Sequence, residues 1–427
     1  MFDRPGGGGR ALLAHIEFRQ EDAHEELEEF RELAHAAGVV CVECITGKRR
    51  VPDPKFFVGG GKAEEIRAAI ERTETELVIF NHALSPAQER NLEQFLHCRV
   101  LDRIGLILDI FAQRAQTFEG KLQVELAQLK HISTRLVRGW THLERQKGGI
   151  GLRGPGEKQL ETDRRLVSDR MRWIDRRLGQ VSRRRDLSRR ARRKAAVPVA
   201  SLVGYTNAGK STLFNRLTGA NGLVADKLFA TLDPTLRRIP LPGSGPAVLV
   251  DTVGFIRHLP HELVAAFRAT LEETRESHLL LHVIDASAPE RGGNTTQVNQ
   301  VLKEIGAAEL PQIEVFNKID RVDGRLPEVE RDENGRVRRL WLSAATGEGV
   351  EELRQAMAER LGAATIHRRI RLSPAAGRLR ARLFQLAAVL GEHAEANGDC
   401  VLEVEISPRR LEQLCRDEGL DRACIAA

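Results

Sequence analysis

The sequence predicts an α/β protein with a doubly wound parallel sheet at its centre and smaller structured regions on either side. Three observations predict this arrangement. In residues 10–110 and again in 197–362, apolar strand-like runs alternate with helical patterns, which is typical of parallel sheets covered by helices. Between these regions, residues 111–194 carry two long heptad patterns around a glycine-rich turn. The last stretch, 363–427, contains two strand patterns and one helical pattern.

We therefore expect four domains: a small parallel α/β domain over 1–110, an antiparallel helical hairpin over 111–194, a central α/β domain over 195–362, and a small α+β domain over 363–427. A chain of 427 residues is long enough for two to four domains. No apolar run approaches the ~18 residues that cross a bilayer, so no transmembrane helix is expected. The N-terminus lacks the apolar core of a signal peptide, and six scattered cysteines fit a reducing cytoplasm.

The N-terminal region alternates strand and helix patterns. Strands are expected at 10–18, 39–45, 77–80 and 99–102. Helices are expected at 21–37, 63–73 and 85–96. Ser85 is the predicted N-cap of the third helix, with Pro86 at its first position. The run Gly59-Gly60-Gly61-Lys62 lacks the full spacing of a phosphate loop, which favours a structural turn.

The hairpin prediction rests on two seams of apolar residues. Helices are expected over 111–147 and 158–194, each as one continuous element. The first seam contains Leu122, Leu126, Leu129, Ser133, Leu136, Trp140 and Leu143, and the second contains Leu160, Val167, Met171, Ile174, Leu178 and Val181. The turn at 148–156 has a G-x-G-x-x-G spacing, but a polar helix precedes it, so a dinucleotide loop is excluded. Such arms would project roughly 45 Å.

Positive charge is concentrated in the second helix of the hairpin. Residues 164–194 contain 14 Lys or Arg and three Asp, whereas the whole chain has a net charge of only +6. A basic block on a mildly acidic body indicates a polyanionic partner, although a solvated helix face is the alternative. Because Trp173 is the only aromatic residue of the block, recognition of the phosphate backbone or shape of structured RNA is favoured over base stacking.

Residues 197–217 combine a strand-like run, a glycine loop and the start of a helix, and the loop fits the phosphate-binding pattern G-x-x-x-x-G-K-[ST]. Its backbone N–H groups and the helix N-terminus would face a phosphate chain. Lys210 is expected to reach the β- and γ-phosphates, and the Ser211 hydroxyl to ligate Mg²⁺. The loop residues expected to contact the nucleotide are Gly204, Tyr205, Thr206, Asn207, Ala208, Gly209, Lys210 and Ser211.

Three downstream segments each follow an apolar strand. The first is Asp251-Thr252-Val253-Gly254, in which the Asp would hold Mg²⁺ through water and the glycine amide would sense the γ-phosphate. The others are Asn317-Lys318-Ile319-Asp320 and Ser343-Ala344-Ala345. In this order the segments are similar to the signature of translation-factor-type P-loop GTPases. In that class the Asp320 carboxylate accepts hydrogen bonds from guanine N1–H and the 2-amino group, a donor pair that adenine lacks.

The remaining elements are predicted by pattern. Residues 222–234 are expected to form a mobile switch loop with two candidate Mg²⁺-binding threonines, Thr231 and Thr235. Helices are expected at 261–276, 296–306 and 350–361, and a strand at 279–285. In the tail we expect a strand at 369–372, a helix at 374–396 and an alternating strand at 401–406.

Five stretches resemble the HflX family of ribosome-associated GTPases: 55–66, 109–129, 148–164, 228–233 and 251–271. The resemblance implies a cytoplasmic GTPase that binds the large (50S) ribosomal subunit and its rRNA through the hairpin. The family is associated with splitting or rescuing stalled ribosomes under stress. Membrane association of relatives implies a peripheral membrane location as an alternative, and we expect a monomer.

The resemblance also implies roles for the switch segment. Phe229, Ala230, Thr231, Leu232 and Asp233 would contact the nucleotide, and Thr231 rather than Thr235 would ligate Mg²⁺ beside Ser211. The catalytic residues would then be Lys210, Thr231 and Gly254. Phe255 stands where water-orienting GTPases carry Gln, so intrinsic hydrolysis should be slow and completed by the ribosome. Asn207 makes K⁺ a second candidate cofactor beside Mg²⁺, because related GTPases with Asn there use K⁺.

Two other classes of function stay open at this point. One is an RNA-binding scaffold whose purine-nucleotide site is structural rather than a GTP switch. The other is a small-GTPase-like switch for a protein or membrane partner. Guanine preference that depends on Asp320 distinguishes the first of these from a GTPase.

Overall fold

The computed structural model describes residues 9–18, 23–136, 155–194, 197–220, 228–229, 231–242, 245–257, 268–362, 366–395, 398–406 and 408–426. The described residues form two compact units. The first contains those of Met1–Arg185, Val224–Pro234 and Val253–Leu271, and the second contains those of Asp186–Leu223, Thr235–Thr252 and Glu272–Ala427. Within the described part of the chain, no helix has the length and apolar character to cross a membrane.

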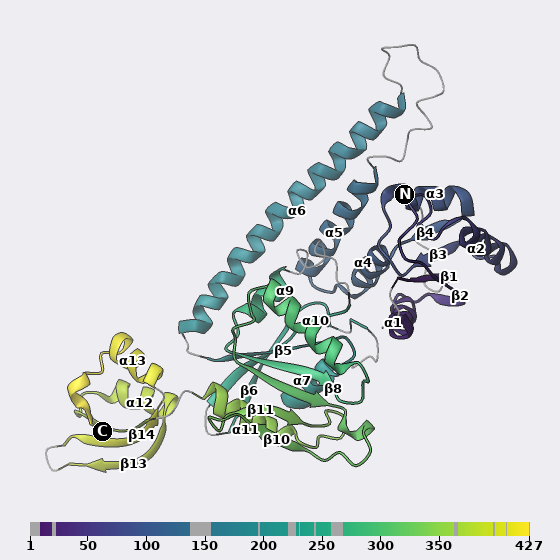
Figure 1. The fold of residues 1–427 in the computed structure, drawn as a ribbon. Helices are drawn as coiled ribbons and strands as arrows, with labels where there is room; N and C mark the ends of the chain where they lie inside the picture. Colours follow the sequence, from purple (N-terminus) through teal and green to yellow (C-terminus); the bar gives the residue numbers. More distant parts are fainter. Residues whose placement is uncertain are drawn as a thin grey trace. The chain divides into compact units, whose positions relative to one another are not determined.

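The first unit begins with the parallel sheet that the sequence predicts (Figure 1). Its strands, in the order β2-β1-β3-β4, are β1 (Arg10–Glu17), β2 (Val40–Lys48), β3 (Leu77–Phe80) and β4 (Arg99–Leu101). The helices between them are α1 (Ala23–Ala36), α2 (Gly60–Thr73) and α3 (Pro86–Leu96). The predicted cap of α3 is confirmed, since Ser85 Oγ accepts from the Gln88 N–H and the Gln88 side chain accepts from the Ser85 N–H. At α2, the first turn already begins at Gly60, and Gly59 is its N-cap with φ 79°.

The prediction of one helix over 111–147 is wrong. The structure has two helices, α4 (Arg103–Arg114) and α5 (Phe118–Leu136), separated by Ala115–Thr117. α4 begins before the predicted helix and packs against α1 and β3 of the N-terminal region. Its buried residues include Leu106, Ile107, Leu108, Ile110 and Phe111. Ala115 then adopts an extended conformation that ends α4.

The hairpin helices α5 and α6 (Pro155–Lys194) lie side by side (Figure 1). The predicted seam is confirmed where it is described: the buried residues are Leu122, Leu126 and Ile174, with Leu129, Met171 and Leu178 packed against them. An exposed bidentate ion pair between Arg170 and Glu125 also joins the two helices. The predicted turn and the far end of the first arm fall within 137–154, outside the described residues.

The second unit contains a seven-stranded sheet in the order β10-β11-β9-β8-β5-β7-β6. Its strands are β5 (Val199–Gly204), β6 (Thr235–Leu241), β7 (Gly245–Asp251), β8 (Leu279–Asp285), β9 (Gln312–Asn317), β10 (Glu328–Arg331) and β11 (Val337–Trp341). The inner strands are parallel, and β6 and β10 pair antiparallel at the two edges. The associated helices are α7 (Lys210–Thr218), α9 (Arg268–Arg275), α10 (Arg291–Glu304), η1 (Ile319–Arg321) and α11 (Val350–Leu361).

The tail contains a four-stranded antiparallel sheet in the order β13-β14-β12-β15. Its elements are β12 (Ile366–Leu372), α12 (Gly377–Leu386), β13 (Ala388–Ala394), β14 (Cys400–Ile406), α13 (Pro408–Asp417), η2 (Arg422–Cys424) and β15 (Ile425–Ala426). The prediction of one helix over 374–396 is therefore wrong in its second half. There, pairing with β14 wins over helix propensity, and Gly391 lies at a register shift within β13. The predicted alternation of β14 is confirmed, since Leu402, Val404 and Ile406 are all buried.

Candidate nucleotide site

The phosphate loop connects β5 to α7, and its two motif glycines occupy positions that no other residue fits. Gly204 has φ +148°, and a Cβ atom there would lie 2.2 Å from the backbone oxygen of Val283. Gly209 has φ +90°, and its Cβ would lie 2.2 Å from Asn317 Nδ2. A Cβ contact under 3 Å forces the neighbour to shift. Gly204 is therefore required by the close approach of β8, and Gly209 by its positive φ and its contact with the Asn317 side chain.

Lys210 is enclosed by the loop that precedes it. Its Nζ donates to the backbone oxygens of Gly204 at 3.1 Å and Tyr205 at 2.6 Å, and only 6% of the residue is exposed. Burial lowers the pKa of Lys210 to about 8, with Asp251 opposing the shift and Lys318 adding to it. The side chain is therefore held at the start of α7 as a cation that loses its proton more readily than an exposed lysine.

This pKa predicts a pH dependence of nucleotide binding. A phosphate binds the ammonium form, so above the pKa of about 8 the free protein must take up a proton on binding. We expect the affinity for GDP to fall by about tenfold between pH 7 and pH 9. Titration calorimetry or fluorescent-GDP binding at pH 7, 8 and 9 measures this. The Lys210→Met variant is the control and should lack the trend; an equal trend in both proteins would contradict the assignment.

Ser211, in the first turn of α7, lies next to Asp251, the last residue of β7. Leu202 in β5 is in register with Asp251 at the end of β7, and Ser211 Oγ donates to Asp251 Oδ2 at 2.8 Å. Asp251 is 3% exposed, and the following Thr252 donates its hydroxyl to the backbone oxygen of Leu202 at 2.5 Å. A hydroxyl and a carboxylate oxygen in contact are the type of ligand that Mg²⁺ prefers, so this donor set fits the ion.

The segments expected to recognise the base are joined through Asn317. Its side chain donates to the backbone oxygen of Ala208 at 2.8 Å and accepts from the N–H of Ala344 at 2.9 Å. Asn317 is 2% exposed, so it connects the phosphate loop to the Ser343-Ala344-Ala345 segment from the interior. The exposed Asp320 has one carboxylate oxygen fixed, because Ser343 Oγ donates to Asp320 Oδ1 at 2.5 Å. Lys318 pairs with Asp285 at 2.7 Å.

The predicted site residues fall into two groups. The phosphate loop, Asp251, Asn317–Asp320 and Ser343–Ala345 follow the carboxyl ends of β5, β7, β9 and β11 in the second unit. Those that belong to the first unit are Phe229, Thr231, Leu232, Asp233, Val253 and Gly254. Ala230 lies outside the described residues. The roles of all these residues toward a nucleotide stay predictions.

The switch residues make contacts that sequence reasoning missed. The Phe229 ring packs edge-on against Phe111 of α4, with ring centroids 4.6 Å apart. The Asp233 carboxylate accepts hydrogen bonds from the start of α5. Downstream of Asp251, the backbone oxygen of Arg257 accepts from Arg103 Nη2 at 3.1 Å. Each contact joins segments more than 100 residues apart in the sequence, and a local sequence pattern does not predict which distant residues will pair.

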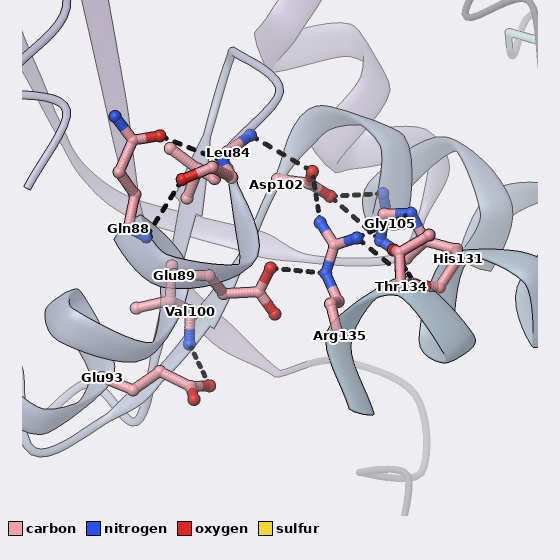
Figure 2. Close-up of polar contacts among 11 residues, drawn as sticks. Leu84, Gln88, Glu89, Glu93, Val100, Asp102, Gly105, His131, Thr134 and Arg135 are labelled. Carbon is pink, nitrogen blue, oxygen red and sulfur yellow. Dashed lines mark hydrogen bonds and ion pairs between the residues drawn. The ribbon is translucent and has the colours of Figure 1, made fainter. Parts of the chain in front are cut away.

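A partly buried ion-pair network links α5 to α3 and to the N-cap of α4 (Figure 2). Arg135 of α5 donates to Glu89 of α3 at 2.6 Å and to Asp102, the N-cap of α4, at 2.8 Å. Burial by itself raises the pKa of Asp102, but hydrogen bonding to His131 and the charge of Arg135 outweigh it, so the pKa lies below its usual range. Burial raises the pKa of Glu89. The network therefore depends on the one guanidinium that both carboxylates share.

Replacement of Arg135 by Met should destabilise the first unit. The Asp102 side chain is 1% exposed, and removal of one partner of a buried pair leaves an uncompensated charge. We expect a loss of about 3–5 kcal/mol, measured by denaturant unfolding. Glu89→Gln should recover part of this loss in the double variant, since the remaining site then holds one carboxylate fewer. Additive losses in the double variant would contradict the shared network.

Comparisons with known proteins converge on one family. Family models described as GTP-binding GTPase N-terminal, GTP-binding GTPase Middle Region and 50S ribosome-binding GTPase match residues 24–112, 114–192 and 199–318. The chain is 57% identical to GTPase HflX of Escherichia coli over 98% of both chains, and 46% identical to GTPase HflX of Magnetococcus marinus over 91% of this chain and 89% of that one. A crystal structure of SsGBP with GDP is 26% identical, with a TM-score of 0.47, over 82% of this chain and 98% of that one.

Proposed function

The chain belongs to the HflX family of GTPases, and from that premise we propose that it binds the large (50S) ribosomal subunit through its hairpin, with the bound nucleotide controlling its affinity for rRNA. Family membership makes the protein a GTP-hydrolysing enzyme, which decides against the scaffold alternative. The physiological outcome that we propose is the splitting or rescue of stalled ribosomes under stress, by a monomeric protein of the cytoplasm. A peripheral membrane location is the alternative, and separation of cell extracts into membrane and soluble fractions distinguishes the two locations.

The observation that carries the ribosome proposal is the exposed arginine face of α6. The described seam residues of α6 pack against α5. Among the α6 residues whose side chains the structure describes, seven arginines are exposed: Arg164, Arg165, Arg170, Arg172, Arg176, Arg177 and Arg183. Guanidinium groups lie over the ring of Trp173, with Arg170 at 4.5 Å and Arg177 at 5.8 Å from its centroid. The ring is thus engaged by cations, and this supports contacts with RNA phosphates rather than with stacked bases.

Charge reversal on this face tests the contact. Arg176→Glu/Arg183→Glu changes two exposed residues, whereas the neighbouring Arg185 pairs with Glu119 at 2.9 Å and would confound the result. We expect weaker binding to 50S subunits, and a salt dependence whose slope falls by about two on a log–log plot. Arg336→Glu/Arg338→Glu is the matched control, since both residues are exposed, Arg336 just before β11 and Arg338 within it. Equal effects of the two double variants would place the rRNA contact elsewhere.

The proposed hydrolysis uses the arrangement around the phosphate loop. Lys210 stabilises charge on the β- and γ-phosphates, and the amide of Gly254 senses the γ-phosphate. Mg²⁺ would neutralise further phosphate charge; Ser211, whose hydroxyl contacts Asp251, would hold it, and the family resemblance implies Thr231 as a second ligand. Phe255 is 1% exposed and cannot hydrogen-bond a water molecule, so no side chain at that position orients the nucleophile. We therefore propose that intrinsic turnover is slow and that the ribosome completes the site.

Two measurements test this part of the proposal. GTP turnover with and without 50S subunits should differ strongly, and equal rates would refute ribosomal completion of the site.

Asn207 is exposed in the phosphate loop with φ 60°, and we propose that it supports binding of K⁺ as an additional counter-charge. Turnover that is unchanged when Na⁺ replaces K⁺ would remove the K⁺ proposal while leaving the rest intact.

A further inference from the structure

Asp233 completes the N-terminus of α5. Its Oδ2 accepts from the backbone N–H groups of Gln116 at 3.0 Å and Thr117 at 2.9 Å, and its Oδ1 accepts from Thr117 Oγ1 at 2.5 Å. Thr117 Oγ1 in turn accepts from the N–H of Gly120 at 2.9 Å. The first N–H groups of a helix have no partner within the helix, and a negative charge is favourable there. The Asp233 carboxylate of the switch segment therefore accepts three hydrogen bonds from Gln116 and Thr117, which connect α4 to α5 and are called the α4–α5 corner below.

Apolar packing adds to the same contact. Leu228, Phe229 and Leu232 are each at most 4% exposed. Phe229 has φ 55°, a left-handed conformation that is unfavourable for a bulky residue, and its ring meets Phe111 at the end of α4. A residue persists in such a conformation only where its surroundings determine it. Phe229 is thus held by an apolar contact with α4, and Asp233 by hydrogen bonds with the residues that precede α5.

Gly120 is an independent sign that the chain makes room for this contact. It is buried in the first turn of α5, where glycine is a poor helix former compared with alanine. A Cβ atom at Gly120 would lie 2.2 Å from Asp233 Oδ1 and 3.0 Å from its carboxylate carbon. By contrast, a Cβ at Gly179 of α6 would meet nothing within 4 Å. The side chain missing at Gly120 leaves the space that the Asp233 carboxylate occupies.

We infer that Asp233 is a positioning residue that couples the nucleotide switch to the hairpin. Thr231, the proposed Mg²⁺ ligand, lies two residues before Asp233, a separation that spans at most about 7 Å of chain. A displacement of Thr231 on nucleotide exchange must therefore act on the three hydrogen bonds that Asp233 makes with the α4–α5 corner. This inference deepens the proposed function and rests on it, because the hairpin is the proposed rRNA-binding element.

The contact itself is tested without ribosomes. In hydrogen–deuterium exchange of the GDP-bound full-length protein, Asp233→Ala should expose the amides of Gln116 and Thr117, raising their exchange by about tenfold or more. Gly120→Ala should raise the exchange of the same two amides, because the added methyl group displaces the Asp233 carboxylate. This rise is expected even though alanine favours the helical conformation of α5 more than glycine does. Gly179→Ala is the matched control and should leave both amides unchanged. Unchanged exchange in both Asp233→Ala and Gly120→Ala would overturn the inference.

The coupling is tested with 50S subunits. For each variant, the ratio of subunit affinities with a non-hydrolysable GTP analogue and with GDP is measured. In Gly120→Ala this ratio of subunit affinities should fall to within about twofold of one. The affinity of the variant for GDP itself should stay at the wild-type value. A Gly120→Ala ratio equal to that of wild type and Gly179→Ala would overturn the inference. A wild-type ratio of one would instead refute the proposed function, and the exchange experiment would then decide on the Asp233 contact alone.

Discussion

Asp320→Asn should abolish most of the preference of this protein for guanine nucleotides. Two charge-assisted hydrogen bonds from guanine to the carboxylate would become at most one neutral bond, with an amide donor facing a guanine donor. We expect GDP affinity to fall by about 10²–10³-fold, the equivalent of about 3–4 kcal/mol. Xanthine has an oxygen in place of the 2-amino group, so the same variant should gain affinity for xanthosine nucleotides.

The measurement is the ratio of dissociation constants for GDP, xanthosine diphosphate and ADP in the two proteins. Ser343→Ala serves as the graded control, because it removes the hydroxyl that donates to Asp320 Oδ1 but leaves the carboxylate in place. It should cost about tenfold or less without gain for xanthosine. Guanine preference that survives in Asp320→Asn would show that the base is recognised elsewhere.

Lys210→Met should nearly stop GTP hydrolysis while the protein stays folded. Met retains most of the apolar stem inside the loop, but the ammonium that donates to Gly204 and Tyr205 is lost. Because a buried cation at the transferring phosphate acts mainly in the transition state, we expect kcat to fall by about 10²–10³-fold. Single-turnover hydrolysis with saturating GTP measures this loss. A variant that binds GTP but hydrolyses it at the wild-type rate would contradict the role of Lys210.

The sequence predicted best what is local. The strand Leu77–Phe80, the strand Leu279–Asp285 and the helix Val350–Leu361 have the expected bounds, because each is a compact apolar or amphipathic run between clear breakers. The phosphate loop is likewise a contiguous motif whose glycines are fixed by backbone geometry. The two wrong helices, over 111–147 and 374–396, show where local pattern loses to packing. In the first, α4 packs against α1 and β3 and ends at the extended Ala115, and in the second, strand pairing replaces helix.

Contacts between distant segments could not be predicted in the same way. The resemblance assigns Asp233 to the nucleotide, which stays a prediction, but gives no indication that its carboxylate accepts hydrogen bonds from Gln116 and Thr117, just before α5. The partners of Arg135 come from α3 and from the cap of α4, and only the folded sheet brings Glu89 and Asp102 together. Sequence patterns give the identity of such residues, whereas their partners follow from the tertiary structure.

The central claim is that guanine nucleotide controls binding of this protein to the large ribosomal subunit. Co-sedimentation of the full-length protein with separated 30S and 50S subunits, in the presence of GTP, GDP or a non-hydrolysable GTP analogue, tests it most directly. We expect selective recovery with 50S subunits, strongest with the analogue, weakest with GDP and decreasing steeply as salt is raised. Equal recovery with all nucleotides, or none with 50S subunits, would contradict the claim.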